Sequence, residues 1–262
     1  QRHQRAGPVM ELTPDFAAFE AAWKAGQNQL VTIRLAADLD TPVSLMLKLA
    51  EAAPMSFMLE SVTGGEVRGR YSIVGMKPDL IWDCRDGKAR INRNARYSDD
   101  FQPDDRPALD SLRALIAETR IDMPDGVPAG AAGLFGYLGY DMIRLVERLP
   151  DVNPDPLGLP DAMMLRPSVV AVLDGVKGEV TLCAPVWRNG GDNARAAYAQ
   201  AAERVMDALR ADSKDSIVLV TPAFPETGRT VYQGNLFVGS VPLNESPLKD
   251  HPLNPKIGRA HV

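Results

Sequence analysis

The chain has 262 residues, of which 45% are hydrophobic and 24% charged, a composition typical of a globular protein with one large or two small domains. The formal net charge of −5 predicts no basic face for nucleic acid. No apolar run approaches the ~18 residues of a membrane span, and the basic N-terminus lacks the apolar segment of a signal peptide. We therefore expect a cytoplasmic protein that binds neither nucleic acid nor membranes.

The N-terminal region predicts a helix, a strand and a second helix. Residues 13–26 predict a helix with Thr13 as its N-cap, Pro14 at its first position and Gly26 at its end. Residues 29–37 have the pattern of a strand, and residues 41–53 repeat the Thr-Pro opening of a helix.

From Ser56 to Arg93 the pattern changes to short β-strands separated by turn signals. Gly64-Gly65 and Asp86-Gly87 supply the positive φ angles that tight hairpins need. Between these turns, residues 67–76 and 79–87 predict two separate strands, one on each side of Lys77.

Helices and strands continue to alternate along the rest of the first domain. Residues 107–121 and 192–211 predict helices, and residues 168–175 and 179–187 predict a β-hairpin. Segment 131–141, "AAGLFGYLGYD", contains glycines of the kind found where backbone packs closely on backbone. The order of elements predicts an α+β fold, with antiparallel sheets and flanking helices.

Few side chains offer chemistry. The three histidines, His3, His251 and His261, give little basis for a catalytic triad or a metal site. The acidic segment 99–105 lacks the glycine and terminal glutamate of a calcium loop and predicts a solvated loop. Cys84 and Cys183 match no disulfide or zinc spacing and lie in strand patterns, so we expect buried, reduced thiols.

The remaining candidate is the stretch "FMLESVTGGEVRGRYSIVGM", residues 57–76, which sets Glu60 and Ser61 between two apolar runs. By its residues alone it predicts a hairpin with a polar strand end. Three segments, however, resemble the N-terminal region of anthranilate synthase component I in their order and spacing: "MLESVTGGEVRGRYSIVGMKP", "GLFGYLGYDMIRLVERLP" and "LPDAMMLRPSVVAVLD". We therefore predict a domain of this family over 10–212, with an incomplete version of the family's fold.

The resemblance implies a role for the first of these segments. In the family, the Leu-Glu-Ser box forms part of the allosteric pocket for the feedback inhibitor L-tryptophan, which implies that Leu59, Glu60 and Ser61 bind the inhibitor. The chemistry suits that role, because a carboxylate accepts a charge-assisted hydrogen bond from an α-ammonium group and a hydroxyl can donate or accept.

The family's reaction converts chorismate to anthranilate and pyruvate, with Mg²⁺ held by glutamates. A glutamine amidotransferase, component II, delivers the ammonia. The resemblance places the metal ligands and the chorismate contacts in the C-terminal half of the subunit, which we expect to be absent from this sequence. We accordingly expect no catalytic residue and no metal ligand here, and no activity of the chain by itself.

The C-terminal region has a different character. "PAFPETGRTVYQG" and "HPLNP" resemble the N-terminal domain of four-carbon acid sugar kinases of the 3-oxo-tetronate kinase type, which predicts a kinase-like fragment over 213–255. The ending "KIGRAHV", residues 256–262, can be encoded by codons that contain a common sequencing adapter, so we expect an artefactual tail. The alternative is a genuine C-terminal extension, and the DNA sequence of those codons distinguishes the two.

Three other functions remain open. Component I of 4-amino-4-deoxychorismate synthase shares the fold and can carry a similar box, and inhibition of the intact enzyme by tryptophan distinguishes it. A non-catalytic tryptophan-binding module predicts that this chain binds L-tryptophan. In the third alternative the kinase-like tail is the functional part.

Overall fold

The computed structural model describes residues 11–37, 39–50, 53–60, 69–150, 154–188 and 193–214, and three short strands between residues 221 and 242. The chain forms two compact units, Gln1–Leu209 and Arg210–Val262. The second unit contains an antiparallel sheet in the order β11-β10-β9, formed by β9 (Thr221–Phe224), β10 (Arg229–Tyr232) and β11 (Gly239–Pro242). The predicted turn at Gly64-Gly65 and the predicted tail at 256–262 lie outside the described residues.

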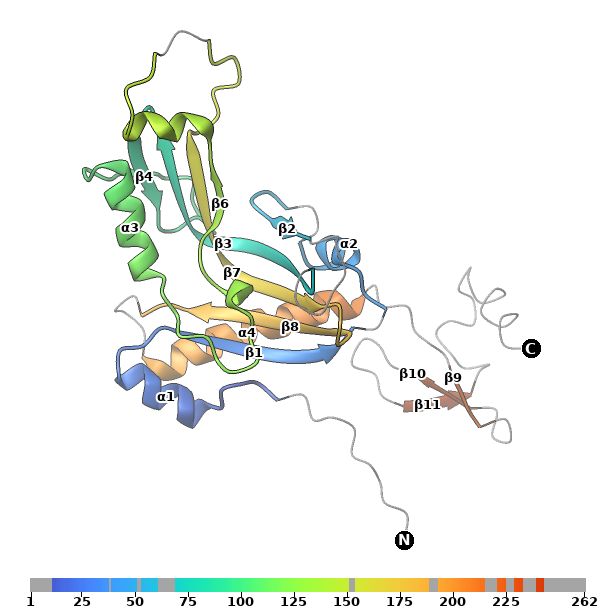
Figure 1. Ribbon diagram of the computed structural model, residues 1–262. Coiled ribbons are helices and arrows are strands. Elements are labelled where there is room, and N and C mark those ends of the chain that lie inside the picture. The colour runs from blue at the N-terminus through green and yellow to red at the C-terminus, as the bar shows by residue number, and fades with distance from the viewer. Residues whose placement is uncertain are drawn as a thin grey trace. The chain divides into compact units, whose positions relative to one another are not determined.

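The first unit is built on an eight-stranded sheet in which all the strand pairs are antiparallel (Figure 1). The strand order is β1-β8-β7-β3-β4-β5, with β2 paired to β3 and β6 paired to β7. The strands are β1 (Gln29–Ala36), β2 (Phe57–Leu59), β3 (Tyr71–Arg85), β4 (Lys88–Asn92), β5 (Gln102–Pro103), β6 (Phe135–Leu138), β7 (Ala162–Asp174) and β8 (Glu179–Val186). This arrangement confirms the predicted α+β class.

Strands β3 and β7 pair with each other in the middle of the sheet, and we call this pair the spine. The sequence predicted separate strands on the two sides of Lys77, whereas β3 is one strand of 15 residues. Lys77 has a φ of 50°, and the β3–β7 register shifts between Pro78 and Leu80. Because a bulge bends a strand and increases its twist, the spine continues through this point but changes direction. Before the bulge β3 pairs with β2, and after it β3 pairs with β4.

Helices flank the sheet, as the sequence predicted. No helix among the described residues is long and apolar enough to cross a membrane. The helices are α1 (Phe16–Lys24), α2 (Pro42–Leu45) with the π-helical turn η1 (Met46–Ala50), α3 (Ala108–Glu118), the short 3-10 turns η2 (Ala129–Ala131) and η3 (Tyr140–Leu145), and α4 (Ala194–Lys214).

The helix caps follow the sequence signals with one exception. Thr41 caps α2 in a capping box, in which Thr41 and Ser44 each bond the other's backbone N–H. The predicted start of α1 was wrong: Pro14 precedes the helix, and the N-cap is Asp15, whose side chain accepts from the backbone N–H of Ala18 at 2.8 Å. Thr13 instead forms a β-bridge with Thr32 of β1, because its backbone groups find partners in the neighbouring strand.

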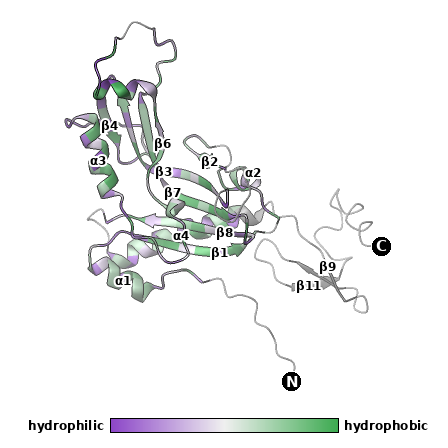
Figure 2. Cartoon of the chain, in the orientation of Figure 1, coloured by the Kyte–Doolittle hydropathy of each residue, from purple (hydrophilic) through white to green (hydrophobic). Residues whose placement is uncertain are grey.

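Apolar residues fill both sides of the spine. Five consecutive residues of β7, from Val169 to Leu173, are buried, which requires cover on both faces of the sheet. Figure 2 shows the same hydrophobic character along β7. One core lies where α3 packs on Leu80 and Trp82, and another lies where Ala131 and Ala132 pack on the strands near Val170.

The glycine-rich segment behaves as predicted. A Cβ on Gly136 of β6 would overlap the carbonyl group of Met163 on β7, and a Cβ on Gly139 would approach the carbonyl oxygen of Asp161 to 2.7 Å. These glycines therefore let β6 lie tightly against β7. The Asp86-Gly87 turn is also confirmed, since both residues have positive φ angles, 49° and 71°.

Candidate ligand-binding site on the edge strand

Strand β2 carries the first part of the predicted ligand-binding box. Leu59 is its last residue, with 51% of its surface exposed, and Glu60 follows directly and is also exposed. Ser61 lies outside the described residues. In Figure 1, β2 is a short strand at the margin of the sheet. We call Leu59 and Glu60 the β2 edge.

Apolar side chains of β3 adjoin this edge. Leu59 lies directly opposite Ile73 in the antiparallel register, so their side chains share one face of the sheet. Alternation along β3 puts Tyr71, which is 37% exposed, on that same face. The β2 edge therefore combines an exposed carboxylate with neighbouring exposed apolar surface.

An ion pair fixes the start of β3 beside this edge. Arg70 donates to both oxygens of Asp174, from Nε at 3.0 Å and from Nη2 at 2.6 Å. Its guanidinium also lies 5.0 Å from the centre of the Tyr71 ring. The hydrogen bonds from Arg70, followed by the backbone N–H groups of Lys177 and Val176, lower the pKa of the Asp174 carboxyl group.

The chemistry of the β2 edge suits a small amphipathic cation. An ammonium group can donate a charge-assisted hydrogen bond to the Glu60 carboxylate. An apolar body attached to that group would remove surface of Leu59 and Tyr71 from water, which is favourable. The structure describes two of the three predicted site residues, Leu59 and Glu60, which are neighbours in the sequence, and their role stays a prediction.

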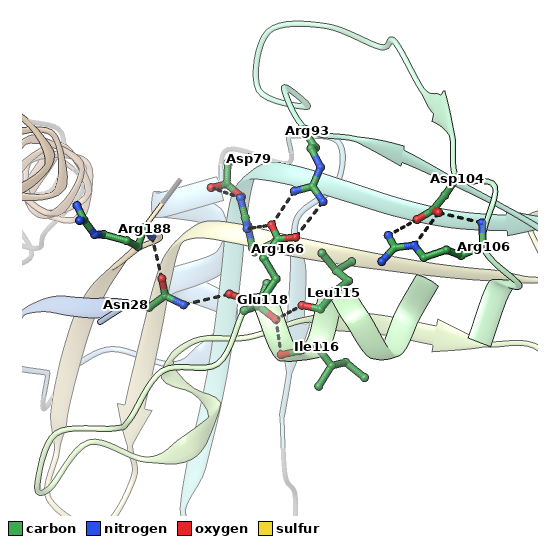
Figure 3. Close-up of polar contacts among 11 residues, drawn as sticks. Asn28, Asp79, Arg93, Asp104, Arg106, Leu115, Ile116, Glu118, Arg166 and Arg188 are labelled. Carbon is green, nitrogen blue, oxygen red and sulfur yellow. Dashed lines mark hydrogen bonds and ion pairs between the residues drawn. The ribbon is translucent and has the colours of Figure 1, made fainter. Parts of the chain in front are cut away.

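A second polar group lies at the bend of the spine and was not predicted from the sequence (Figure 3). Arg166 of β7 is 2% exposed and donates to Asp79 through Nε at 2.7 Å and Nη2 at 3.1 Å. Its Nη1 lies 3.6 Å from Glu118 at the end of α3, and its guanidinium lies 4.8 Å from the centre of the Trp187 ring. Arg93 holds the same Glu118 by two hydrogen bonds and lowers the pKa of its carboxyl group.

This group stabilises the bend. It links β3, β7, the residue that follows β4 and the end of α3 through charges that neutralise one another, whereas an isolated buried guanidinium would be costly. Periodicity could not reveal it, because Arg166 interrupts an apolar strand and its partners are far away in the sequence.

The described residues do not fit Mg²⁺. Among them, no group of three or more His, Cys, Asp and Glu side chains could hold a metal ion. Many carboxylates, such as Asp79, Asp83 and Asp104, are instead paired with arginine. Asp104 belongs to the predicted solvated loop, but it accepts hydrogen bonds from Arg106 and Ser111, which hold its pKa well below the usual range.

The cysteines occupy the positions predicted for them. Both are free and buried, and burial raises the pKa of each thiol, to about 12 for Cys183. Neither is suited to act as a nucleophile, since the reactive form is the thiolate.

Most of the chain is similar in sequence to one group of known proteins. The chain is homologous to anthranilate synthase component 1: it is 72% identical to that of Cereibacter sphaeroides over 196 residues, covering 74% of this chain and 39% of the relative. It is 36% identical to that of Thermus thermophilus over 218 residues, covering 70% of this chain and 45% of the relative. The chain thus spans less than half the length of these relatives.

The C-terminal region is similar to other proteins. Residues 197–257 match a family described as a sugar-binding N-terminal domain. A stretch of 51 residues is 86% identical to the 3-oxo-tetronate kinase of Methylobacterium radiotolerans, covering 20% of this chain and 12% of the kinase.

Among solved structures, anthranilate synthase component I from Streptococcus pneumoniae is similar with a TM-score of 0.44 and 22% identity, covering 67% of this chain and 36% of that one.

Proposed function

We propose that the first unit is the N-terminal, regulatory part of an anthranilate synthase component I, and that Leu59, Glu60 and Ser61 belong to its L-tryptophan site. The 72% identity to the Cereibacter sphaeroides protein over 196 residues is the observation that carries this proposal. The exposed carboxylate at the β2 edge supports it, because tryptophan presents an ammonium group and an apolar ring.

The proposed reaction belongs to the intact enzyme. That enzyme would convert chorismate to anthranilate and pyruvate, with Mg²⁺ at its active site and with ammonia from a glutamine amidotransferase, component II. We assign no catalytic residue to this chain and propose that it is inactive by itself. Its part in the reaction would be regulatory, through tryptophan bound at the β2 edge.

A hybrid subunit tests the proposal. The 196 matched residues would replace their counterparts in the Cereibacter sphaeroides subunit, whose sequence they share at 72% identity. Anthranilate formation by the hybrid, followed by fluorescence with ammonia as the nitrogen source, should fall as L-tryptophan is added. In a Glu60→Gln hybrid, loss of a hydrogen bond to a charged group, worth about 1.5–3 kcal/mol, should raise the half-inhibiting concentration about 10- to 100-fold.

Each rate is compared with that of the same variant without tryptophan, so that a change in basal activity does not obscure the result. Asp110→Asn is a matched control, because Asp110 is an exposed carboxylate on α3 that forms an ion pair with the neighbouring Arg113. An active hybrid that tryptophan does not inhibit would refute the regulatory role. It would also favour the alternative, a component I of 4-amino-4-deoxychorismate synthase.

Two further alternatives have their own tests. The non-catalytic tryptophan-binding module requires the 262-residue chain to bind L-tryptophan, so a calorimetric titration without heat at millimolar ligand would exclude it. A function for the kinase-like region is favoured only by the match at residues 197–257, and its kinase relative is covered over 12% of its length. Binding of a four-carbon sugar acid, measured in the same way, would support that function.

A further inference from the structure

The aromatic ring of Phe57 occupies the space where a side chain at residue 75 would lie. Phe57 of β2 is directly opposite Gly75 of β3. A Cβ added to Gly75 would overlap the Cζ and Cε1 atoms of the Phe57 ring. Gly75 is itself buried, and the outer end of the ring lies against its backbone. Only glycine at this position permits that placement.

The Phe57 ring also contacts a strand from a different part of the sheet. Phe135 of β6 stacks on Phe57, with ring centres 4.6 Å apart and an angle of 29° between the planes. Strand β2 lies beyond β3 and strand β6 lies beyond β7, so the two rings come from opposite sides of the β3–β7 pair. The bend of the spine at Lys77 and Pro78 allows strands that far apart in the order to make contact.

Strand β2 needs such an anchor. It has three residues and pairs with β3 along one side. Short edge strands open readily, since few backbone hydrogen bonds hold them. A stacked aromatic pair adds stabilisation beyond the burial of its apolar area. Phe57 is two residues before Leu59, so its ring fixes the strand immediately before the β2 edge.

We propose that Gly75 and Phe135 are positioning residues for the β2 edge: they hold the Phe57 ring in one place, and the ring fixes the strand that presents Leu59 and Glu60 to the ligand. This inference rests on the proposed function in one respect, the identity of the ligand as L-tryptophan. The positioning itself does not depend on the ligand and can be measured without it.

Hydrogen exchange on the 262-residue chain tests the positioning. Phe135→Leu removes the stack but keeps an apolar side chain, and Gly75→Ala displaces the ring. Both variants should make the amides of Phe57–Leu59 exchange about threefold to tenfold faster. The amides of β8 serve as an internal reference and should keep their rates.

Two control variants match these changes. Tyr140→Leu replaces an aromatic residue that is 84% exposed, in the segment that follows β6. Gly175→Ala adds a Cβ that would meet the Arg70 carbonyl oxygen at 3.5 Å, an ordinary contact. Neither should change exchange in β2. Unchanged β2 exchange in both test variants, or equal acceleration in β8, would overturn the inference.

The hybrid subunit provides the functional readout. Phe135→Leu and Gly75→Ala should each raise the tryptophan concentration for half-inhibition at least about tenfold, as expected when a binding group is displaced by about an ångström. If the unmodified hybrid is inhibited and both variants are inhibited equally well, the inference fails and the proposed function stands. If the unmodified hybrid is not inhibited, the proposed function fails, and the exchange experiment still decides whether the stack positions β2.

Discussion

Removing one charge of the Arg166–Asp79 ion pair should destabilise the first unit more than replacing both residues with apolar ones. Asp79→Asn would leave Arg166, which is 2% exposed, without its bidentate partner. Removing one partner of a buried pair costs about 3–5 kcal/mol. Asp79 is 31% exposed and Glu118 remains 3.6 Å from Arg166, so we expect a smaller cost than this range, about 2–3 kcal/mol.

The assay is thermal unfolding followed by circular dichroism. For a domain of roughly 200 residues, each kcal/mol shifts Tm by about 2–4 °C, which predicts a decrease of about 4–12 °C for Asp79→Asn. The double variant Asp79→Leu/Arg166→Met replaces both charges with apolar groups and should lose less than the single variant. Asp110→Asn, which breaks a pair in which both side chains are more than half exposed, should change Tm by less than about 2 °C.

The comparison between the single and double variants decides whether an unpaired buried charge is what destabilises the bend. If Asp79→Asn unfolds within about 2 °C of the unmodified chain, the buried guanidinium does not depend on Asp79. If the double variant is the less stable of the two, the charges themselves, rather than the avoidance of an unpaired charge, stabilise the bend.

Three further outcomes are expected. Because the native pKa of Asp174 is lowered, its ion pair stabilises the fold fully above the unfolded pKa of about 4, and this stabilisation is lost as the pH falls through the lower native pKa. Asp174→Asn should therefore lower the urea midpoint more at pH 7 than at pH 3. Cys84 and Cys183 should not react with a disulfide reagent at pH 8 in the native chain, and both should react in urea; reaction in the native chain would contradict their burial. Gly136→Ala should lower Tm by at least about 4 °C, since its Cβ overlaps the Met163 carbonyl group; an unchanged Tm would show that β6 can move aside at no cost.

Local signals in the sequence predicted the elements of the fold well. The Asp86-Gly87 turn, the capping residue Thr41 and the long alanine-rich helix are specified by neighbouring residues, and the structure contains all three. Thr13 was misassigned because a threonine before a proline is a good N-cap by local rules, whereas pairing with Thr32 depends on a strand farther along the chain.

Features that join distant segments could not be predicted in this way. The continuity of β3 through Lys77 requires β7 as a partner along its whole length. Likewise, the pairing of Arg166 with Asp79 and the stacking of Phe57 on Phe135 join residues that no periodicity relates. The candidate site was found by resemblance to a family, because Glu60 and Ser61 alone do not differ from the polar end of any hairpin strand.

The most direct test of the proposed function is a calorimetric titration of L-tryptophan into the hybrid subunit and into its Glu60→Gln variant. We predict a saturable heat of binding for the hybrid and an affinity about 10- to 100-fold lower for the variant. A folded hybrid that binds no tryptophan, or that binds it equally well without the Glu60 carboxylate, would contradict the assignment of the β2 edge as the regulatory site.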